Sequence, residues 1–261
     1  MDNAYKIKKE KEEKAKSLLD SIDTYLLKKL DITLPKEEKV VSFEVSSSDV
    51  FGGRFDPIYK LKLNNINNLN GKYPMYELKF LMIGSPQYGA NETAKEYQSN
   101  NDIRYIRITD IDELGELKKN NIKTANNTLE QYILNYNDIL FARSGSVGRC
   151  YIHKDIKHKA IFAGYLIRFI LDERKINQDY FFYYCHSSIY KYWVSAIERS
   201  TVQSNINSQE YKSLKIPLPP LNIQNEIASH IQALRDEAKQ LKQEAKEILK
   251  KAKDEVEGIV L

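Results

Sequence analysis

The sequence has few cysteines, glycines and prolines, and it contains no long apolar run. Its 261 residues include 2 Cys, 10 Gly and 7 Pro. Two cysteines are too few for a disulfide framework, and so little Gly and Pro excludes collagen-like and low-complexity chains. No stretch approaches the roughly 18 consecutive apolar residues that suggest a membrane span. The charged start, residues 1–14, leads into no apolar segment of a secretory signal, so we expect a cytoplasmic protein with no membrane partner.

What the sequence does contain is ordinary for a protein with a core. Hydrophobic residues make up 42% and charged residues 29%, which excludes disorder along the whole chain. The net charge is only +4, but residues 35–220 carry 25 Lys and Arg against 21 Asp and Glu. This segment also holds nearly all the aromatic residues. A basic, aromatic-rich centre is compatible with binding a polyanion, although many enzymes have the same composition.

Both ends of the chain are predicted to be helical. Over residues 4–30 Lys, Glu and Ala dominate, and an apolar stripe runs from Ala15 to Leu26 at spacings of three and four. Pro35 marks the end of this helix. A second helix is predicted for 221–261, with Asn222 as its N-cap.

The second helix has a strict heptad pattern, which favours a coiled coil. It would be roughly 55–60 Å long, so we expect it to protrude and to need a partner that covers its apolar edge. The alternative is a long helix that packs on its own domain. The apolar positions are Ile227, Ile231, Leu234, Ala238, Leu241, Ala245, Ile248 and Ala252.

The segment between the helices has short β-rich runs separated by polar, Asn-rich turns. Strands are predicted at 78–83, 103–108, 138–143, 149–153 and 160–170, and an aromatic helix at 178–195. The fold class is therefore α+β. We expect a globular domain with a mixed, twisted sheet at 35–220, flanked by an N-terminal helix, 1–34, and a long coiled-coil helix, 221–261.

No motif predicts catalysis convincingly. Asp56, Glu77 and Lys79 could form a metal-dependent nuclease site, but Glu-x-Lys arises by chance in so charged a chain. Residues 85–88, Ser-Pro-Gln-Tyr, resemble the amine-binding loop of amino-methyltransferases, yet no Gly-rich turn follows a strand to bind the methyl donor. The four His and two Cys lack metal-ligand spacing. We expect no catalytic residue, no metal and no cofactor.

Two loops suit a nucleic acid. Arg143, Ser144 and Gly145 begin an Arg-flanked Ser/Gly loop that would present backbone N–H groups to a phosphate or a base edge; a plain hairpin turn with solvated arginines fits the pattern equally well. The second loop, 200–207, contains Thr201, Gln203 and Asn205. Its amides could pair with adenine, although such a run is usually a loop that caps a helix.

A weaker candidate comes from aromatic and basic residues that lie close together in the sequence. Tyr88 and Gly89 follow one predicted strand, and Arg107 lies in another. Alternation along that strand would point Arg104 and Arg107 to opposite faces, so only one of the two could face a ligand.

Four stretches together resemble the specificity subunit of type I restriction-modification systems: 18–30, 136–153, 160–170 and 203–231. The last is the most specific. It runs from Gln203-Ser204-Asn205-Ile206-Asn207 through Ile216-Pro217-Leu218-Pro219-Pro220 into the long helix. The likeness covers nearly the whole chain and is weakest over 40–135.

The resemblance implies a target recognition domain joined to a conserved spacer helix, without catalysis of its own. In the family, two such domains read the halves of a split double-stranded DNA target, and methyltransferase and translocating nuclease subunits join them. This chain has one recognition domain, so it resembles a half subunit, whether from a short gene, a rearranged gene or a truncation. The resemblance places the residues named in the two loops at the DNA, with Tyr88, Gly89 and Arg107 as weaker candidates.

A half subunit should pair with its own copy along the heptad edge and read a palindromic split site. Two other functions remain open. One is a free-standing nuclease that uses Asp56, Glu77 and Lys79, and the other is a coiled-coil adaptor that binds only protein.

Overall fold

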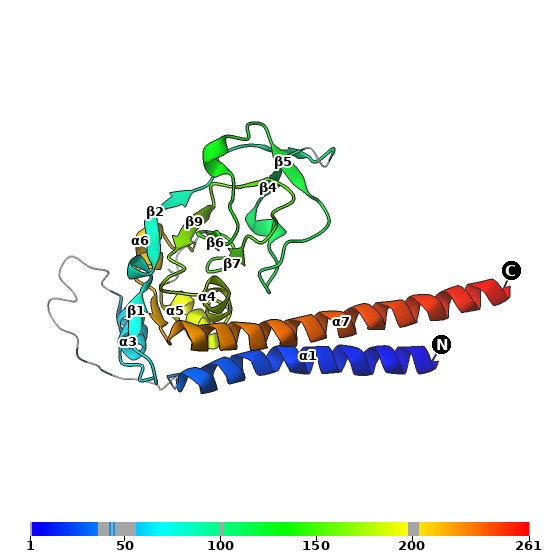
Figure 1. The fold of residues 1–261 in the computed structure, drawn as a ribbon, viewed down its shortest axis with the longest axis horizontal. Helices are drawn as coiled ribbons and strands as arrows, with labels where there is room; N and C mark the ends of the chain where they lie inside the picture. The colour runs from blue at the N-terminus through cyan, green and yellow to red at the C-terminus, as the bar shows by residue number, and fades with distance from the viewer. Residues whose placement is uncertain are drawn as a thin grey trace.

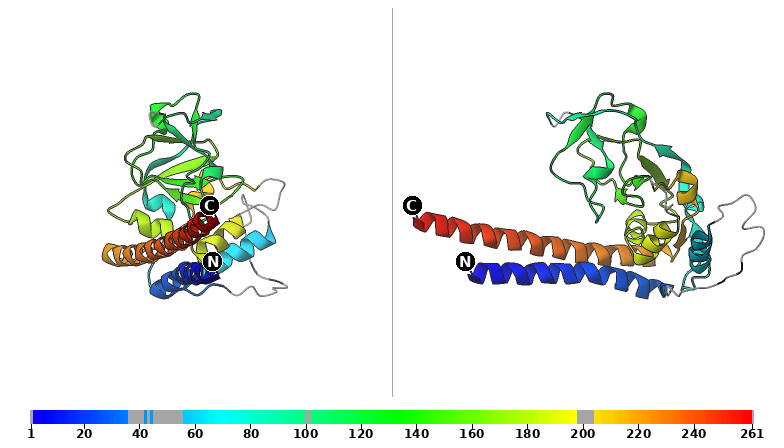
Figure 2. Two further views of the ribbon diagram at one scale, coloured as in Figure 1. Left: turned by 90° about the vertical axis from the view of Figure 1, so that its right-hand side faces the viewer. Right: turned by 180° about the vertical axis from the view of Figure 1, so that it is seen from behind.

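The computed structural model describes residues 2–35, 42, 44, 56–99, 102–197 and 204–260. A body of strands and short helices stands on one end of a pair of long helices, and both chain termini lie at the other end of the pair (Figure 1). The two helices run side by side in all three views (Figures 1 and 2). No helix within the described residues is both long enough and apolar enough to cross a membrane.

Helices and strands follow one another irregularly along the chain, as expected for an α+β fold. In order they are α1 Asp2–Leu30, α3 Pro57–Asn67, β1 Met75–Glu77, the 3-10 turn η1 Leu78–Phe80, β2 Met82–Tyr88, β3 Ala94–Glu96, β4 Arg104–Ile106, η2 Ile108–Asp110, β5 Lys123–Ala125, η3 Glu130–Tyr132, β6 Ile139–Ala142, β7 Cys150–Ile152, β8 Ala160–Phe162, β9 Leu166–Leu171, α4 Gln178–Tyr184, α5 Ser188–Ile197, α6 Ser208–Lys212, β10 Lys215–Pro217 and α7 Leu221–Val260.

The long helices α1 and α7 form an antiparallel pair. At one end Lys29 pairs with Glu226 at 2.6 Å, and the Tyr25 and His230 rings lie 4.1 Å apart. Toward the other end the Lys11 ammonium lies 2.6 Å from a Glu244 carboxylate oxygen. The predicted heptad edge faces into this pair: Ile227, Ile231, Ala238 and Ala245 are buried, and Leu234, Leu241, Ile248 and Ala252 are half-buried.

The expectation that the heptad edge has no cover within one chain is wrong. The chain's own α1 covers it, because α1 has a matching apolar stripe in which Ala15 and Leu26 are almost completely buried. The start of α7 also packs on the body, where Ile227 and Ile231 join the main core. The predicted N-cap is wrong as well: α7 begins at Leu221, so Asn222 lies within its first turn.

The main sheet is antiparallel and has the strand order β2-β9-β6-β7. Its central strand β6 is buried on both faces. Ile139 and Phe141 face the main core with α4 and α5, whereas Leu140 and Ala142 face a second core. Strands covered on both sides read as continuous apolar runs, which explains the sequence pattern. A parallel pair, β4 with β8, makes the fold mixed.

Three predicted elements are each divided in two. Residues 160–170 form β8 and β9, because the chain turns at Gly164, whose N–H donates to Ala90 O at 2.8 Å. Residues 78–83 divide between η1 and β2, and 178–195 between α4 and α5. In each case only one to three residues separate the two elements, and apolar periodicity does not register so short a break.

Candidate nucleic-acid interface

Three loops and the end of β2 meet at one place beside the main sheet. The loops are the one after β6, the corner between β8 and β9, and the segment before α6. The backbone of Arg143, just after β6, donates to Tyr165 O at 3.0 Å and accepts from Ile206 N at 2.8 Å. The next residue, Ser144, forms a β-bridge with Asn205. The structure therefore joins the loop after β6, the corner between β8 and β9, and the segment before α6.

The loop after β6 has a rigid base and an exposed tip. Gly145 at the tip has φ +71° and Gly148 at the base has φ +80°, conformations that favour glycine. Two buried tyrosines hold the base. The Tyr211 hydroxyl donates to Ala142 O at 2.7 Å and accepts from Gly148 N at 3.2 Å, and the Tyr190 hydroxyl donates to Gly148 O at 2.7 Å. These hydrogen bonds tie both ends of the loop to the buried core.

Arg143 lies against an aromatic ring, and one of its donors is unused. The centre of its guanidinium is 4.9 Å from the centroid of the Tyr88 ring. Its Nε is buried and has no hydrogen-bond partner among the described residues, and neither has the buried Oδ1 of Asn205. Unpaired buried polar atoms are costly, so their presence at one place favours a site that a polar ligand completes. The predicted residues Arg143, Ser144, Asn205 and Tyr88 are therefore brought together.

Gly89 has a packing reason as well as a place beside the site. A Cβ atom at this position would lie 2.3 Å from Ala163 O and 2.4 Å from Phe162 O. Only glycine lets the end of β2 approach the corner after β8 so closely. Gly89 therefore shapes the site through its backbone.

Arg107 lies near the same loops, but its guanidinium is engaged. It donates to both carboxylate oxygens of Asp110, at 3.0 and 2.6 Å, and to Asn121 O at 3.2 Å. The hydrogen bonds that Arg107 donates to the Asp110 carboxylate raise the pKa of Arg107. Thr201 and Gln203, the other predicted residues, lie outside the described residues.

The sequence pattern did not predict that the corner between β8 and β9 forms part of the site. Ala163 and Tyr165 come from a run that was interpreted as one strand, and Tyr165 is 61% exposed. Gly164 was the available signal, because a glycine inside a strand pattern often marks a close backbone approach. The buried Tyr211 had no such signal, since its role depends on contacts distant in sequence.

The three residues of the hypothetical nuclease site, Asp56, Glu77 and Lys79, form hydrogen bonds or ion pairs within the fold. A carboxylate oxygen of Asp56 caps α3 by accepting from Tyr59 N at 3.1 Å. Glu77 and Lys79 pair with each other at 2.6 Å. Within the described part of the chain, no three His, Cys, Asp or Glu residues lie close enough together to hold a metal ion. Gln87, from the methyltransferase-like loop, accepts from Arg168.

Two solved structures share the fold of this chain. A chain from a structure entitled "Structural basis underlying complex assembly and conformational transition of the type I R-M system" matches with a TM-score of 0.58 and 14% identity, over 97% of this chain and 53% of that one. The HsdS subunit from Thermoanaerobacter tengcongensis matches with a TM-score of 0.53 and 13% identity, over 97% and 55%. These likenesses concern the fold, and the chain spans about half the length of both proteins.

A family model gives the more specific result. The model for the type I restriction modification DNA specificity domain matches residues 83–251, which include the sheet, the loops above it and most of α7. Because this match covers well over half of the residues, the chain belongs to the family of type I restriction modification DNA specificity domains.

Proposed function

We propose that the chain recognises a specific sequence in double-stranded DNA and directs methyltransferase and nuclease subunits of a type I restriction-modification system to it. It carries out no catalysis itself in this proposal. Family membership supports the class of function, and the joined loops around Arg143 support the place of contact.

The observation on which this proposal most depends is the state of Arg143. The Arg143 guanidinium lies against the Tyr88 ring, and its buried Nε has no hydrogen-bond partner among the described residues. The ring contact orients the positive charge without pairing it with a carboxylate. Arginine in such a position suits a phosphate oxygen or the edge of guanine. We assign Arg143 to the DNA backbone, with Ser144, Gly145 and Asn205 beside it.

Thr201 and Gln203 keep their proposed contacts with DNA on sequence grounds alone. They precede Asn205, and their side chains can donate to and accept from base edges. Tyr88 serves as the platform for Arg143, and Gly89 allows the close approach of the loops. Arg107 becomes the weakest candidate, because Asp110 already occupies its guanidinium.

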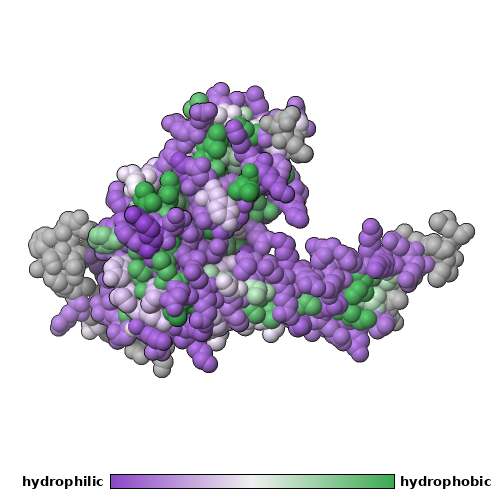
Figure 3. Space-filling view, in the orientation of Figure 1, coloured by the Kyte–Doolittle hydropathy of each residue, from purple (hydrophilic) through white to green (hydrophobic). Residues whose placement is uncertain are grey.

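We further propose that two copies associate to read a palindromic split target. The chain spans about half of each solved structure that it resembles, so two copies would supply two recognition domains. Since α1 covers the heptad edge, the contact would involve the projecting end of the helix pair, where Leu241 and Ile248 are half-buried. An apolar patch lies on this projecting part among mostly hydrophilic residues (Figure 3).

Selection from a random duplex library tests the proposal. The chain, co-expressed with the methyltransferase subunit of its system, should enrich one split motif, and light scattering should find two copies of the chain in the complex. Enrichment of no motif would contradict sequence-specific recognition and favour the protein adaptor. Mg²⁺-dependent cutting of plasmid DNA by the purified chain, abolished in Lys79→Ala, would instead establish the nuclease.

A further inference from the structure

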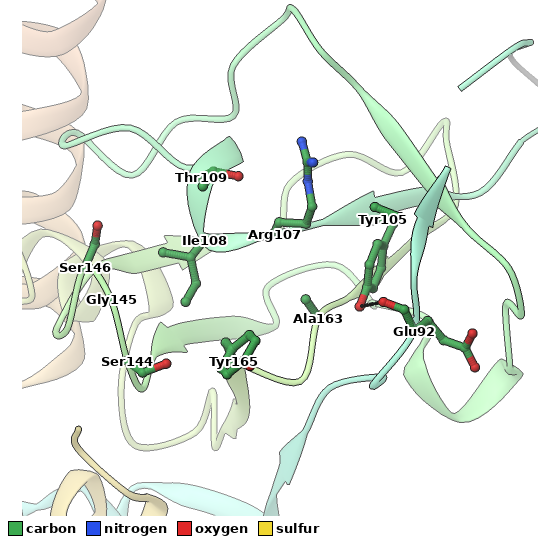
Figure 4. A pocket seen from close by; sticks show the side chains of 11 residues that line it. Glu92, Tyr105, Arg107, Ile108, Thr109, Ser144, Gly145, Ser146, Ala163 and Tyr165 are labelled. Atoms are coloured by element: carbon green, nitrogen blue, oxygen red, sulfur yellow. Dashed lines mark hydrogen bonds between the residues drawn. The ribbon is translucent and has the colours of Figure 1, made fainter. Parts of the chain in front are cut away.

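A cavity of about 520 Å³ opens beside the loop that carries Arg143. This volume lies within the roughly 300–1,000 Å³ of pockets that hold small molecules. One wall comes from β4 and η2, and the opposite wall from the loop after β6 and the β8–β9 corner (Figure 4). Residues used below from these walls are Tyr105, Ile108, Ser144, Ala163 and Tyr165.

The cavity presents mostly apolar surface, and its two charged lining residues both have hydrogen-bond partners. The Glu92 carboxylate accepts from Asn127 Nδ2 at 3.1 Å. Among the described residues Arg107 is the one arginine that lines it, and its guanidinium points away from the opposite wall in Figure 4 and binds Asp110. The Tyr105 hydroxyl is used as well, since its single proton is shared between Ala90 O at 2.9 Å and Glu92 O at 3.1 Å. A phosphate would therefore find no free cation on these described walls, and an uncharged group suits them better.

Two features favour a flat group with a polar edge. Ile108 extends into the cavity from the η2 side toward the exposed Tyr165 ring, and Ala163, whose N–H donates to Ile106 O at 2.9 Å, lies between Tyr165 and Tyr105 (Figure 4). The Ser144 hydroxyl is directed toward the same side as Tyr165. Aromatic rings stack on nucleobases, apolar side chains contact the methyl group of thymine, and hydroxyls bind base edges.

We propose that this cavity receives one unstacked thymine base of the bound DNA. The inference rests on the proposed function, because it requires DNA at the neighbouring Arg143. Ile108 and Ala163 contact the C5-methyl group, the Tyr165 ring lies on the base face, and Ser144 donates to a base oxygen. Such a hollow is far larger than one methyl group at a groove edge requires, and proteins that extrude a base spend only a few kcal/mol on unstacking it.

Binding measurements on the selected motif test the cavity. In the complex with the methyltransferase, replacing each thymine by deoxyuridine removes its methyl group. At one position the affinity should fall about three- to fivefold, the effect of one buried methyl group. A 2-aminopurine placed opposite that thymine should brighten severalfold on binding, since its pairing partner has left the helix.

Three variants connect this effect to the cavity. Ile108→Ala should bind the thymine and deoxyuridine duplexes equally well. Tyr165→Ala should abolish the 2-aminopurine signal, whereas Tyr165→Phe, which keeps the ring, should retain it. Lys9→Ala on the distant helix α1 should behave as the wild type. Thermal unfolding of each variant checks that the fold is intact, and the 61% exposure of Tyr165 makes its replacement mild.

The two proposals fail separately. If the wild-type complex selects a motif and binds it tightly but no thymine is sensitive to deoxyuridine, only the thymine cavity is overturned. The same holds if Ile108→Ala keeps the full sensitivity to deoxyuridine. If no motif is selected at all, the proposed recognition of DNA fails first.

Discussion

Two tyrosine hydroxyls fix the loop that carries the predicted DNA-binding residues. Tyr211 binds both ends of the loop, at Ala142 and Gly148, and its ring stacks on Phe141 with centroids 4.5 Å apart. A loop held in this way loses little conformational entropy when it binds a ligand. In the proposed function, recognition of DNA would depend on the buried tyrosines that hold this loop as well as on the residues in contact with DNA.

Tyr211→Phe should lower the free energy of unfolding by about 1 kcal/mol, because it removes two buried hydrogen bonds, while Gly148 N still donates to Ala142 O at 3.2 Å. Urea denaturation measures the loss. Tyr136→Phe is the matched control, since Tyr136 is 56% exposed. Equal stability of the two variants would contradict the role given to the Tyr211 hydroxyl.

Arg143→Ala should weaken binding to all DNA sequences alike and reduce the slope of log affinity against log salt by about one, as expected for a lost phosphate contact. Fluorescence anisotropy at several salt concentrations gives both quantities. Lys9→Ala, whose side chain is 78% exposed on α1, should leave them unchanged. A loss confined to one sequence would instead assign Arg143 to a base.

His186 should make stability depend on pH. Burial lowers its pKa to about 4, while its Nδ1 donates to Phe182 O at 2.8 Å. Below the ordinary pKa of 6.5 the unfolded chain takes up a proton that the folded chain refuses. Stability should therefore be full above pH 6.5 and fall by on the order of 2 kcal/mol as the pH approaches 4.

Urea denaturation of His186→Gln checks this dependence on pH. The variant should lose less stability than the wild type between pH 6.5 and 4, because its side chain takes up no proton in either state. The same loss in both proteins would show that other groups cause the fall.

At the level of helices and strands, the two long helices were the most predictable elements, although their pairing was not. Heptad spacing from Ile227 to Ala252 identified both the helix and its buried edge. It could not identify the partner, because periodicity describes one face of one helix. That α1 supplies the cover follows from contacts between residues more than 200 positions apart, such as Lys11 with Glu244.

Ala15→Leu should lower the free energy of unfolding by about 1–3 kcal/mol, because Ala15 is fully buried in this helix pair and a larger side chain would overpack it. Chemical denaturation provides the measurement. Lys9→Leu adds an apolar side chain on an exposed face of the same helix and should cost much less. If Ala15→Leu were equally harmless, α1 and α7 would not be packed as described.

The candidate site was predictable only in part, for a similar reason. Arg143 to Gly145 could be found because Ser and Gly between two apolar runs indicate an exposed loop. The Tyr165 corner and the η2 wall could not, because they reach the site through the pairing of β4 with β8. Sequence patterns predict where the loops lie along the chain. The pairing of β4 with β8 determines which of these loops are close in space.

At the scale of the whole molecule, the body of strands and short helices, which we propose binds DNA, lies at one end of the long helix pair (Figure 1). The 40 residues of α7 correspond to roughly 60 Å, more than one turn of duplex DNA at about 34–36 Å. Two copies joined at the far ends of their helix pairs would hold their two proposed DNA-binding bodies apart. The gap in the target would then follow from the helices rather than from the loops.

Sequencing DNA methylation in a host with and without this chain, in the presence of its methyltransferase, measures recognition in the cell. We predict that one split palindromic motif is methylated only when the chain is present, and that Arg143→Ala reduces methylation of that motif. Methylation that is the same with and without the chain would contradict its role in choosing the target.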